Sequence, residues 1–411
     1  MKLSYLLAIL SIATVSCSVS NKVEKSTTKT DGAMQYAFFD MGDKQVDMIE
    51  KNNAFVFDLF KNVSGHDSKV VSPISVTCLI GMLANGADGQ TRQEMLNMLG
   101  WNGQEVDDVN KLCNNVISLA GHSDGAVELD IANYVGVSNN EKLKEEFKKS
   151  VDLFYKGKVE SLDFRSAKSV ERINSWCNSR TKGMIPKLLN GINPQTTICA
   201  VNAIYFNGTW KDKFDSALTR KEVFNGYTKD IKKVDMMHRN GTYRYYEGSG
   251  FSAVAMPYND GQYEMLAFLP FRGVSMDDVL DSLKANGINS IRRNMATCDV
   301  DLKLPRFSIE TEQPLNQVIS NMGSRRMFTD EAEFNNLVES RSYVSEMKQK
   351  AKIEVSEEGT KAAAATYVQM VGMTAFTPKR RQVEFHANRP FLYAIIEKSS
   401  GTIFFIGQYV G

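Results

Sequence analysis

The sequence contains little of what most catalytic and metal centres require. Only 4 histidines occur in 411 residues, and the 6 cysteines are widely separated. Phosphate-binding loops, dinucleotide fingerprints and H-E-x-x-H zinc motifs are absent. Apart from Cys17 an odd number of cysteines remains, without the short spacings of disulfide frameworks or zinc sites. We therefore expect small buried cysteines, no metal and no cofactor.

The sequence also lacks an excess of charge, an internal linker and a long apolar run. Lys and Arg number 49 against 48 Asp and Glu, so neither a nucleic-acid surface nor a polybasic membrane face is expected. No run of about eighteen apolar residues follows the N-terminus, which argues against a membrane-spanning helix. Without a Pro/Ser-rich linker after residue 45, we predict a single domain over residues 46–411, and we expect a monomer.

The N-terminus predicts export. Residues 1–16 combine Lys2, an apolar core and an exit of small residues, which is typical of a signal peptide. Cys17 follows directly, as in bacterial lipoprotein signals, where this cysteine becomes the lipidated first residue. A plain secretory signal with an incidental cysteine is the alternative. Residues 17–45 are rich in Ser, Thr, Lys and Asp and predict a flexible tether. We expect a bacterial envelope protein, an outer-membrane lipoprotein on the periplasmic or outer side, or an extracellular protein.

The hydrophobic pattern changes from helical in the first half to strand-like in the second. Helices are predicted at 47–63, 76–84, 91–99, 106–119 and 141–154. Strands are predicted at 126–135, 198–206, 251–257, 262–270, 300–304, 391–397 and 402–409. Ser72-Pro73 precedes the second helix, with proline in its first turn. This order predicts an α+β fold with large mixed sheets.

One enzymatic motif needs evaluation. Residues 121–125 spell Gly-His-Ser-Asp-Gly and match the G-x-S-x-G nucleophile elbow of hydrolases. That motif places its serine between a strand and a following helix, whereas here a predicted helix precedes Ser123 and a strand follows. His238 and His386 are available as bases but have no supporting motif. A glycine-rich turn is therefore favoured, with a Ser123 hydrolase as the alternative.

The segment after residue 356 has two conflicting patterns. Four consecutive alanines favour a helix, yet small or apolar residues alternate with Lys361, Tyr367 and Gln369, as in a half-buried strand. The stretch that follows, to residue 382, has the character of a long loop, and such loops are commonly functional. A segment that suits both loop and strand indicates a conformational switch; a helical alanine linker is the alternative.

This segment resembles the hinge of the serpin reactive loop. The matching residues are Glu357, Glu358, Gly359, Thr360, Ala362, Ala363, Ala364, Ala365 and Thr366. Further serpin-like motifs occur in order along residues 48–411, among them Ser72-Pro73-Ile74-Ser75, Asn202 with 206–210, 304–307, and 389–392 with 401–407. The resemblance implies three β-sheets, eight or nine helices and an exposed metastable loop at about 357–384. It assigns Ser72, Ser75, Asn202, Trp210 and Gln349 to the shutter and breach that control sheet opening.

The resemblance further implies a protease inhibitor and not an enzyme. Family spacing places the scissile bond at Met373–Thr374, and an apolar methionine suits the primary pocket of elastase-like or chymotrypsin-like serine proteases. The partner would be a serine protease held in a covalent acyl complex. Cleavage after Phe376, or after any of residues 379–381, is the alternative, as are a cysteine-protease inhibitor and a non-inhibitory serpin. Two residues depart from the family pattern: Lys361 replaces the usual glutamate, and Gln349 stands where many serpins carry histidine.

Overall fold

The computed structural model describes residues 42–120, 126–227, 231–360 and 380–411, which belong to one compact unit, Phe38–Gly411. In these ranges the helices are α1 (Asp43–Val63), α2 (Pro73–Gly86), α3 (Gly89–Met98), α4 (Val106–Ala120), α5 (Glu145–Tyr155), α6 (Ala167–Arg180), α7 (Met276–Asn286), α8 (Ile288–Arg293) and α9 (Asn316–Asn321). None of these helices has the length and apolarity needed to cross a membrane. The first helix begins at Asp43, within the segment predicted as tether.

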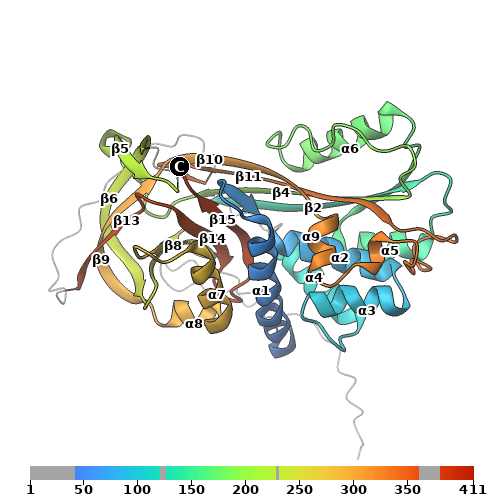
Figure 1. The fold of residues 1–411 in the computed structure, drawn as a ribbon, viewed down its shortest axis with the longest axis horizontal. Coiled ribbons are helices and arrows are strands. Elements are labelled where there is room, and N and C mark those ends of the chain that lie inside the picture. The colour runs from blue at the N-terminus through green and yellow to red at the C-terminus, as the bar shows by residue number, and fades with distance from the viewer. Residues whose placement is uncertain (1–41, 121–125, 228–230, 361–379) are drawn as a thin grey trace, which may run out of the picture. The chain divides into compact units, whose positions relative to one another are not determined.

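A six-stranded sheet lies at the centre of the described unit (Figure 1). Its order is β10 (Phe307–Pro314), β11 (Val344–Val355), β12 (Gly359–Thr360), β4 (Ile198–Thr209), β2 (Val127–Ser138) and β3 (Lys158–Leu162). Helix α6 covers one face over β2 and β4, and α2, α4 and α5 lie on the other side. Strand β4 is apolar on both faces because both are covered, as its sequence predicts.

The larger sheet has nine described strands. Its order is β1 (Lys69–Val71), β15 (Ile403–Tyr409), β14 (Phe391–Glu397), β8 (Tyr263–Pro270), β7 (Phe251–Pro257), β6 (Ile231–Glu247), β9 (Ala296–Pro305) and β13 (Gln382–His386), and β5 (Arg220–Asn225) pairs with β6. The long strand β6 pairs with β5 near its start and with β7 near its end. The family resemblance implied three sheets, whereas the described strands form two. Strand β6 joins two of the expected sheets into this larger one. The predicted α+β fold is confirmed.

Helix α2 lies in the core and contacts β2, β4 and β15. Apart from Asn85, all of its residues are buried, in agreement with the apolar pattern, and Pro73 occupies the first turn after Ser72.

By contrast, the helix predicted from residue 141 begins only at Glu145. The preceding residues pair elsewhere: Leu143 forms an isolated β-bridge with Val338, and the Lys144 amide donates to the carbonyl of Leu337. Tertiary pairing thus overrides the local helical pattern there.

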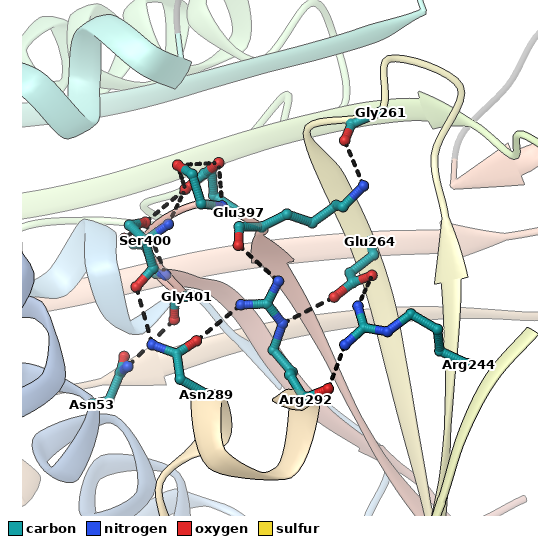
Figure 2. Close-up of polar contacts among 12 residues, drawn as sticks. Asn53, Arg244, Gly261, Glu264, Asn289, Arg292, Glu397, Ser400 and Gly401 are labelled. Carbon is teal, nitrogen blue, oxygen red and sulfur yellow. Dashed lines mark hydrogen bonds and ion pairs between the residues drawn. The ribbon is translucent and has the colours of Figure 1, made fainter. Parts of the chain in front are cut away.

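A buried polar network fastens the β14–β15 turn to helices α8 and α1 (Figure 2). Arg292 on α8 donates to Glu264 Oε1 at 3.0 Å, Asn289 Oδ1 at 2.9 Å and the Lys398 carbonyl at 2.7 Å. The Glu264 side chain is only 3% exposed and lies between two arginines, with Arg292 Nε 3.0 Å from Oε1 and Arg244 Nη1 3.6 Å from Oε2. In the turn, Glu397 accepts hydrogen bonds from Ser399 and Ser400, and Asn53 of α1 donates to the Gly401 carbonyl.

Removing Glu264 is expected to destabilise the protein strongly. Glu264→Ala would leave Arg292 buried without its charged partner, which costs about 3–5 kcal/mol. As a control, Glu331→Ala breaks an ion pair with Arg326 whose carboxylate is 68% exposed, and should cost less than about 1 kcal/mol. Urea unfolding of both variants measures the difference. Equal losses would show that the network contributes no more than a surface ion pair.

Candidate functional site

The candidate site lies where β4 and β11 are paired in the six-stranded sheet, a boundary that we call the seam. The two strands are parallel neighbours, paired from Ile198 opposite Val344 to Ile204 opposite Ala351. Beyond the C-terminal end of this ladder, β12 lies between the two strands, with Thr360 paired to Gly208 of β4 and to Val355 of β11. Because β12 runs antiparallel to both neighbours, it begins a strand whose continuation has a partner on each side.

The first residue of β12 must be glycine. A Cβ atom on Gly359 would lie 2.1 Å from the carbonyl oxygen of Gly208, and its φ of +155° is unfavourable for other residues. The tight turn before it is closed by hydrogen bonds between the Ser356 amide and the Gly359 carbonyl at 2.9 Å, and between the Gly359 amide and the Ser356 carbonyl at 3.3 Å. The absence of a side chain lets this turn enter the sheet.

Trp210 and Tyr258 hold the entering turn. Trp210 donates from Nε1 to the Ser356 carbonyl at 2.9 Å and from its amide to the Glu358 carbonyl at 3.0 Å. Its ring stacks on Tyr258 with centroids 4.6 Å apart. The Tyr258 hydroxyl shares a hydrogen bond of 2.6 Å with Thr360 Oγ1. Burial raises the pKa of Tyr258, so this phenol stays neutral and available for hydrogen bonding.

The two glutamates of the turn are bound by side chains from the chain around β5 and β9. Glu357 Oε1 accepts from Thr219 Oγ1 at 2.7 Å and lies 3.6 Å from Arg306 Nη1. Glu358 Oε2 lies 2.6 Å from Lys213 Nζ, in a pair whose side chains are 33% and 20% exposed. These partly buried contacts fix where the strand β12 begins.

A polar cluster crosses the seam lower down, in an otherwise apolar core. Gln349 Nε2 donates to the Ser72 carbonyl at 2.8 Å, Ser75 Oγ at 3.0 Å and Asn202 Oδ1 at 2.9 Å. The Ser72 amide donates to Gln349 Oε1 at 2.9 Å, and Ser75 Oγ donates to Asn202 Oδ1 at 2.7 Å. Asn202 in turn donates to Asn133 Oδ1 at 2.8 Å. Because these bonds link β4 and β11 to each other and to α2, separating the strands must break them.

The structure therefore brings together the residues that the sequence assigned to the shutter. Ser72 participates through its backbone, however, since its buried hydroxyl has no hydrogen-bond partner among the described residues. Asn133, Lys213 and Tyr258 were not predicted as site residues. Asn133 had a usable signal, a lone amide in the buried strand β2. The predicted site residues Cys17, Ala362, Ala363, Ala364, Ala365, Thr366, Met373 and Thr374 lie outside the described residues.

The hydrolase motif also lies outside the described residues, but its flanks are described. Helix α4 ends at Ala120 and β2 begins at Val127, so the order is helix then strand, opposite to a nucleophile elbow. Both candidate histidines are bound to Asp301: His238 Nε2 lies 2.7 Å from Oδ1, and His386 Nε2 lies 2.9 Å from Oδ2. Such histidine–aspartate pairs also occur in catalytic triads, so the argument against a nucleophile elbow rests on the order of helix and strand.

In this fold the six-stranded sheet can accept one more strand, which would enter at the seam between β4 and β11. A family model described as Serpin (serine protease inhibitor) matches residues 50–411. Antitrypsin of Bombyx mori is 33% identical, covering 86% of this chain and 90% of its own. Corticosteroid-binding globulin of Saimiri sciureus is 28% identical, covering 87% and 89%. The crystal structure of the thermophilic serpin tengpin in its native state matches with a TM-score of 0.82 and 28% identity, covering 90% and 95%. The chain belongs to the serpin family.

Proposed function

We propose that this protein inhibits serine proteases irreversibly, as a suicide substrate. The protease serine attacks the carbonyl carbon of Met373, the Met373–Thr374 bond breaks, and the proton of the serine hydroxyl passes through the protease histidine to the new amine of Thr374. The C-terminal part of the chain stays bound, because its strands β13, β14 and β15 belong to the nine-stranded sheet. The acylated segment then enters the seam as a strand between β4 and β11. The attached protease is dragged with it, and distortion of its oxyanion hole stops hydrolysis of the acyl ester.

The register of β12 carries this proposal. Thr360 pairs with Gly208 and Val355, and continuing the same antiparallel register sets Thr366 opposite both Asn202 and Gln349. Those two residues are paired with each other across the seam. In this register residue 370 would lie opposite Ile198, the first residue of β4, and residue 371 opposite Val344, the first residue of β11. Met373 comes just after that end, so the seam has the length needed to accept the chain up to the proposed scissile bond.

The same register places suitable side chains on each face. Thr360, Ala362, Ala364 and Thr366 would point to the core, where only small residues are needed beside α2. Lys361 would lie opposite Glu354 of β11, whose side chain is 37% exposed. A lysine at this position would therefore meet a carboxylate that already pairs with Lys352 at 2.6 Å. About a dozen new ladder bonds at roughly 0.5–1.5 kcal/mol each would favour insertion by on the order of 10 kcal/mol.

Incubation with pancreatic elastase or chymotrypsin, followed by a denaturing gel, tests the proposal. An inhibitor gives a complex that survives detergent and contains both chains. Cleavage without a complex would instead favour a binding function, as the name of the corticosteroid-binding relative suggests for that protein. A complex with a papain-like enzyme alone would indicate a cysteine-protease inhibitor. Ester turnover lost in Ser123→Ala would indicate a hydrolase.

Met373 is expected to set the target specificity. Met373→Arg should shift complex formation from elastase or chymotrypsin to trypsin, because the primary pocket of trypsin binds a cationic side chain. Association rates measured with each protease should change by about 100-fold or more, equivalent to about 3 kcal/mol. Met373→Leu is the matched control and should keep the original targets. If Met373→Arg still captures elastase at the original rate, the scissile bond lies elsewhere, at Phe376 or among residues 379–381.

We also propose that Cys17 anchors the protein to the bacterial envelope through a lipid. Cys17→Ser should move the protein from the membrane fraction to the soluble fraction, because the lipid forms a thioether with this sulfur. Inhibition should be unchanged, since residue 17 precedes the family match that begins at residue 50. Mass spectrometry of the wild-type N-terminus provides the second measurement. A soluble wild type without lipid would contradict the anchor.

A further inference from the structure

Three loops enclose a cavity of ≈ 500 Å³ that includes no residue of β4, β11 or β12. They are the β5–β6 connection (225–227), the β8–α7 connection (270–276) and the β13–β14 connection (388–390). The volume lies within the range of about 300–1,000 Å³ that is usual for small-molecule sites. The proposed inhibition does not use this cavity.

Hydrogen bonds between the loops form the cavity without a ligand. The Asn225 amide and Nδ2 both donate to the Asn388 carbonyl, at 2.9 and 3.3 Å. Arg389 donates from Nε and Nη2 to the Pro270 carbonyl, at 3.0 and 2.8 Å. Each loop is therefore tied to another by a shared backbone acceptor. A preformed cavity loses little conformational freedom when it binds a ligand.

The charges at the cavity are of one sign. Arg272 and Arg389 both line it, and no other lining residue among those described is charged. Arg272 is exposed and has no ion pair or side-chain hydrogen bond within the described part of the chain. Burial, and then the charge of Arg272, lower the pKa of Arg389. Two guanidinium groups that repel each other, with no counter-ion among the described lining residues, favour binding of an anion.

The rest of the lining includes one aromatic and apolar wall beside the two asparagines Asn225 and Asn388. Tyr227 is 47% exposed, and the ring of His66 supports it edge-on with centroids 5.6 Å apart. Phe271, Val274 and Met276 add apolar surface. Burial, and then the charge of Asp277, raise the pKa of Tyr227. Asp277 is itself attracted to Lys61, so the tyrosine side suits an uncharged group.

We infer that this cavity binds a small amphipathic anion, a carboxylate or sulfonate joined to an aromatic or branched aliphatic group. The anionic end lies against Arg272 and Arg389, and the apolar end packs on Tyr227 and Val274. Arg272 suits the first role because its planar fork can donate two parallel hydrogen bonds to a carboxylate. Arg389 adds its positive charge, since its own donors are directed to the Pro270 carbonyl and to Asn388 Oδ1. The apolar wall supplies the remaining affinity and rejects small inorganic anions.

Fluorescence titration of the folded, uncleaved protein with 8-anilinonaphthalene-1-sulfonate tests this inference. We expect one saturable site, displaced by indole-3-acetate. Arg272→Gln should weaken binding by about tenfold or more, because a charge-assisted contact is lost, and its exposed position should leave the fold intact. Tyr227→Ala should weaken binding as well. Arg325→Gln is the matched control, since Arg325 lines a different cavity of ≈ 530 Å³ next to α9.

Several outcomes would overturn the inference. One is the absence of saturable binding to the wild type. Another is an affinity of Arg272→Gln within about twofold of wild type, or an equal loss in Arg325→Gln. A third is equally tight binding of the neutral probe N-phenyl-1-naphthylamine, unaffected by Arg272→Gln, which would show an apolar site without anion recognition. Because the readout is binding, these results are independent of whether the protein inhibits a protease.

Discussion

Thr360→Arg should convert the proposed inhibitor into a substrate. Thr360 is fully buried beside Tyr258 and is the first residue to pair with both neighbours of the seam. An arginine there would bury a charge without a partner, at a cost of several kcal/mol, so it should expel β12 from the sheet of the uncleaved protein. Insertion would then have to bury the arginine as its first step. Insertion would slow while hydrolysis of the acyl enzyme would not. The number of inhibitor molecules consumed per protease inactivated should rise by about tenfold or more, since 1.4 kcal/mol of barrier already changes a rate tenfold.

Two substitutions at neighbouring positions serve as controls for Thr360→Arg. If the inserted strand continues the register of β12, Lys361 and Ala363 would lie on the outer face of the sheet. Lys361→Arg should then have almost no effect, and Ala363→Arg a smaller effect than Thr360→Arg. Gels that quantify complex and cleaved inhibitor from the same reaction measure all three. Equal trapping by wild type and Thr360→Arg would contradict insertion through β12, as would a loss caused by Lys361→Arg alone.

Cleavage of the loop should raise the thermal stability of the wild type sharply. The inserted strand would replace the single ladder between β4 and β11 by two ladders, one on each of its sides, a net gain on the order of 10 kcal/mol. At about 1 °C or more per kcal/mol for a large domain, Tm should rise by at least about 10 °C. Calorimetry before and after limited proteolysis between residues 361 and 379 measures the shift. Cleaved Thr360→Arg should gain clearly less. An unchanged Tm for cleaved wild type would mean that no strand is added.

The local sequence patterns predicted where helices and strands form better than they predicted which strands pair. The apolar faces of α1 and α2 and the doubly buried strand β4 follow directly from the spacing of their side chains. The union of two sheets through β6 could not be predicted, because pairing with β5 and β7 depends on contacts between segments distant in the chain. The late start of α5 has the same cause, since pairing with residues 337 and 338 overrides a helical pattern.

The site shows the same limit. The family resemblance named Ser72, Ser75, Asn202 and Gln349 together, and in the structure these residues contact one another. Their assignment to a shutter stays a prediction. The resemblance did not identify Asn133, which binds Asn202 across the β2–β4 pair, or Tyr258, which holds Thr360 from a position 102 residues earlier. Nor could it show that Ser72 acts through its backbone. Such partners are decided by the packed geometry, in which each buried polar group needs a specific neighbour.

A crystal structure of the protein cleaved in the loop tests the central claim most directly. The account predicts that β4 and β11 are no longer paired and that one continuous strand lies between them, antiparallel to both. In that strand Thr366 should lie opposite Asn202 and Gln349, and Lys361 opposite Glu354. A cleaved structure in which Ile198 to Ile204 remain paired with Val344 to Ala351 would contradict the proposed mechanism.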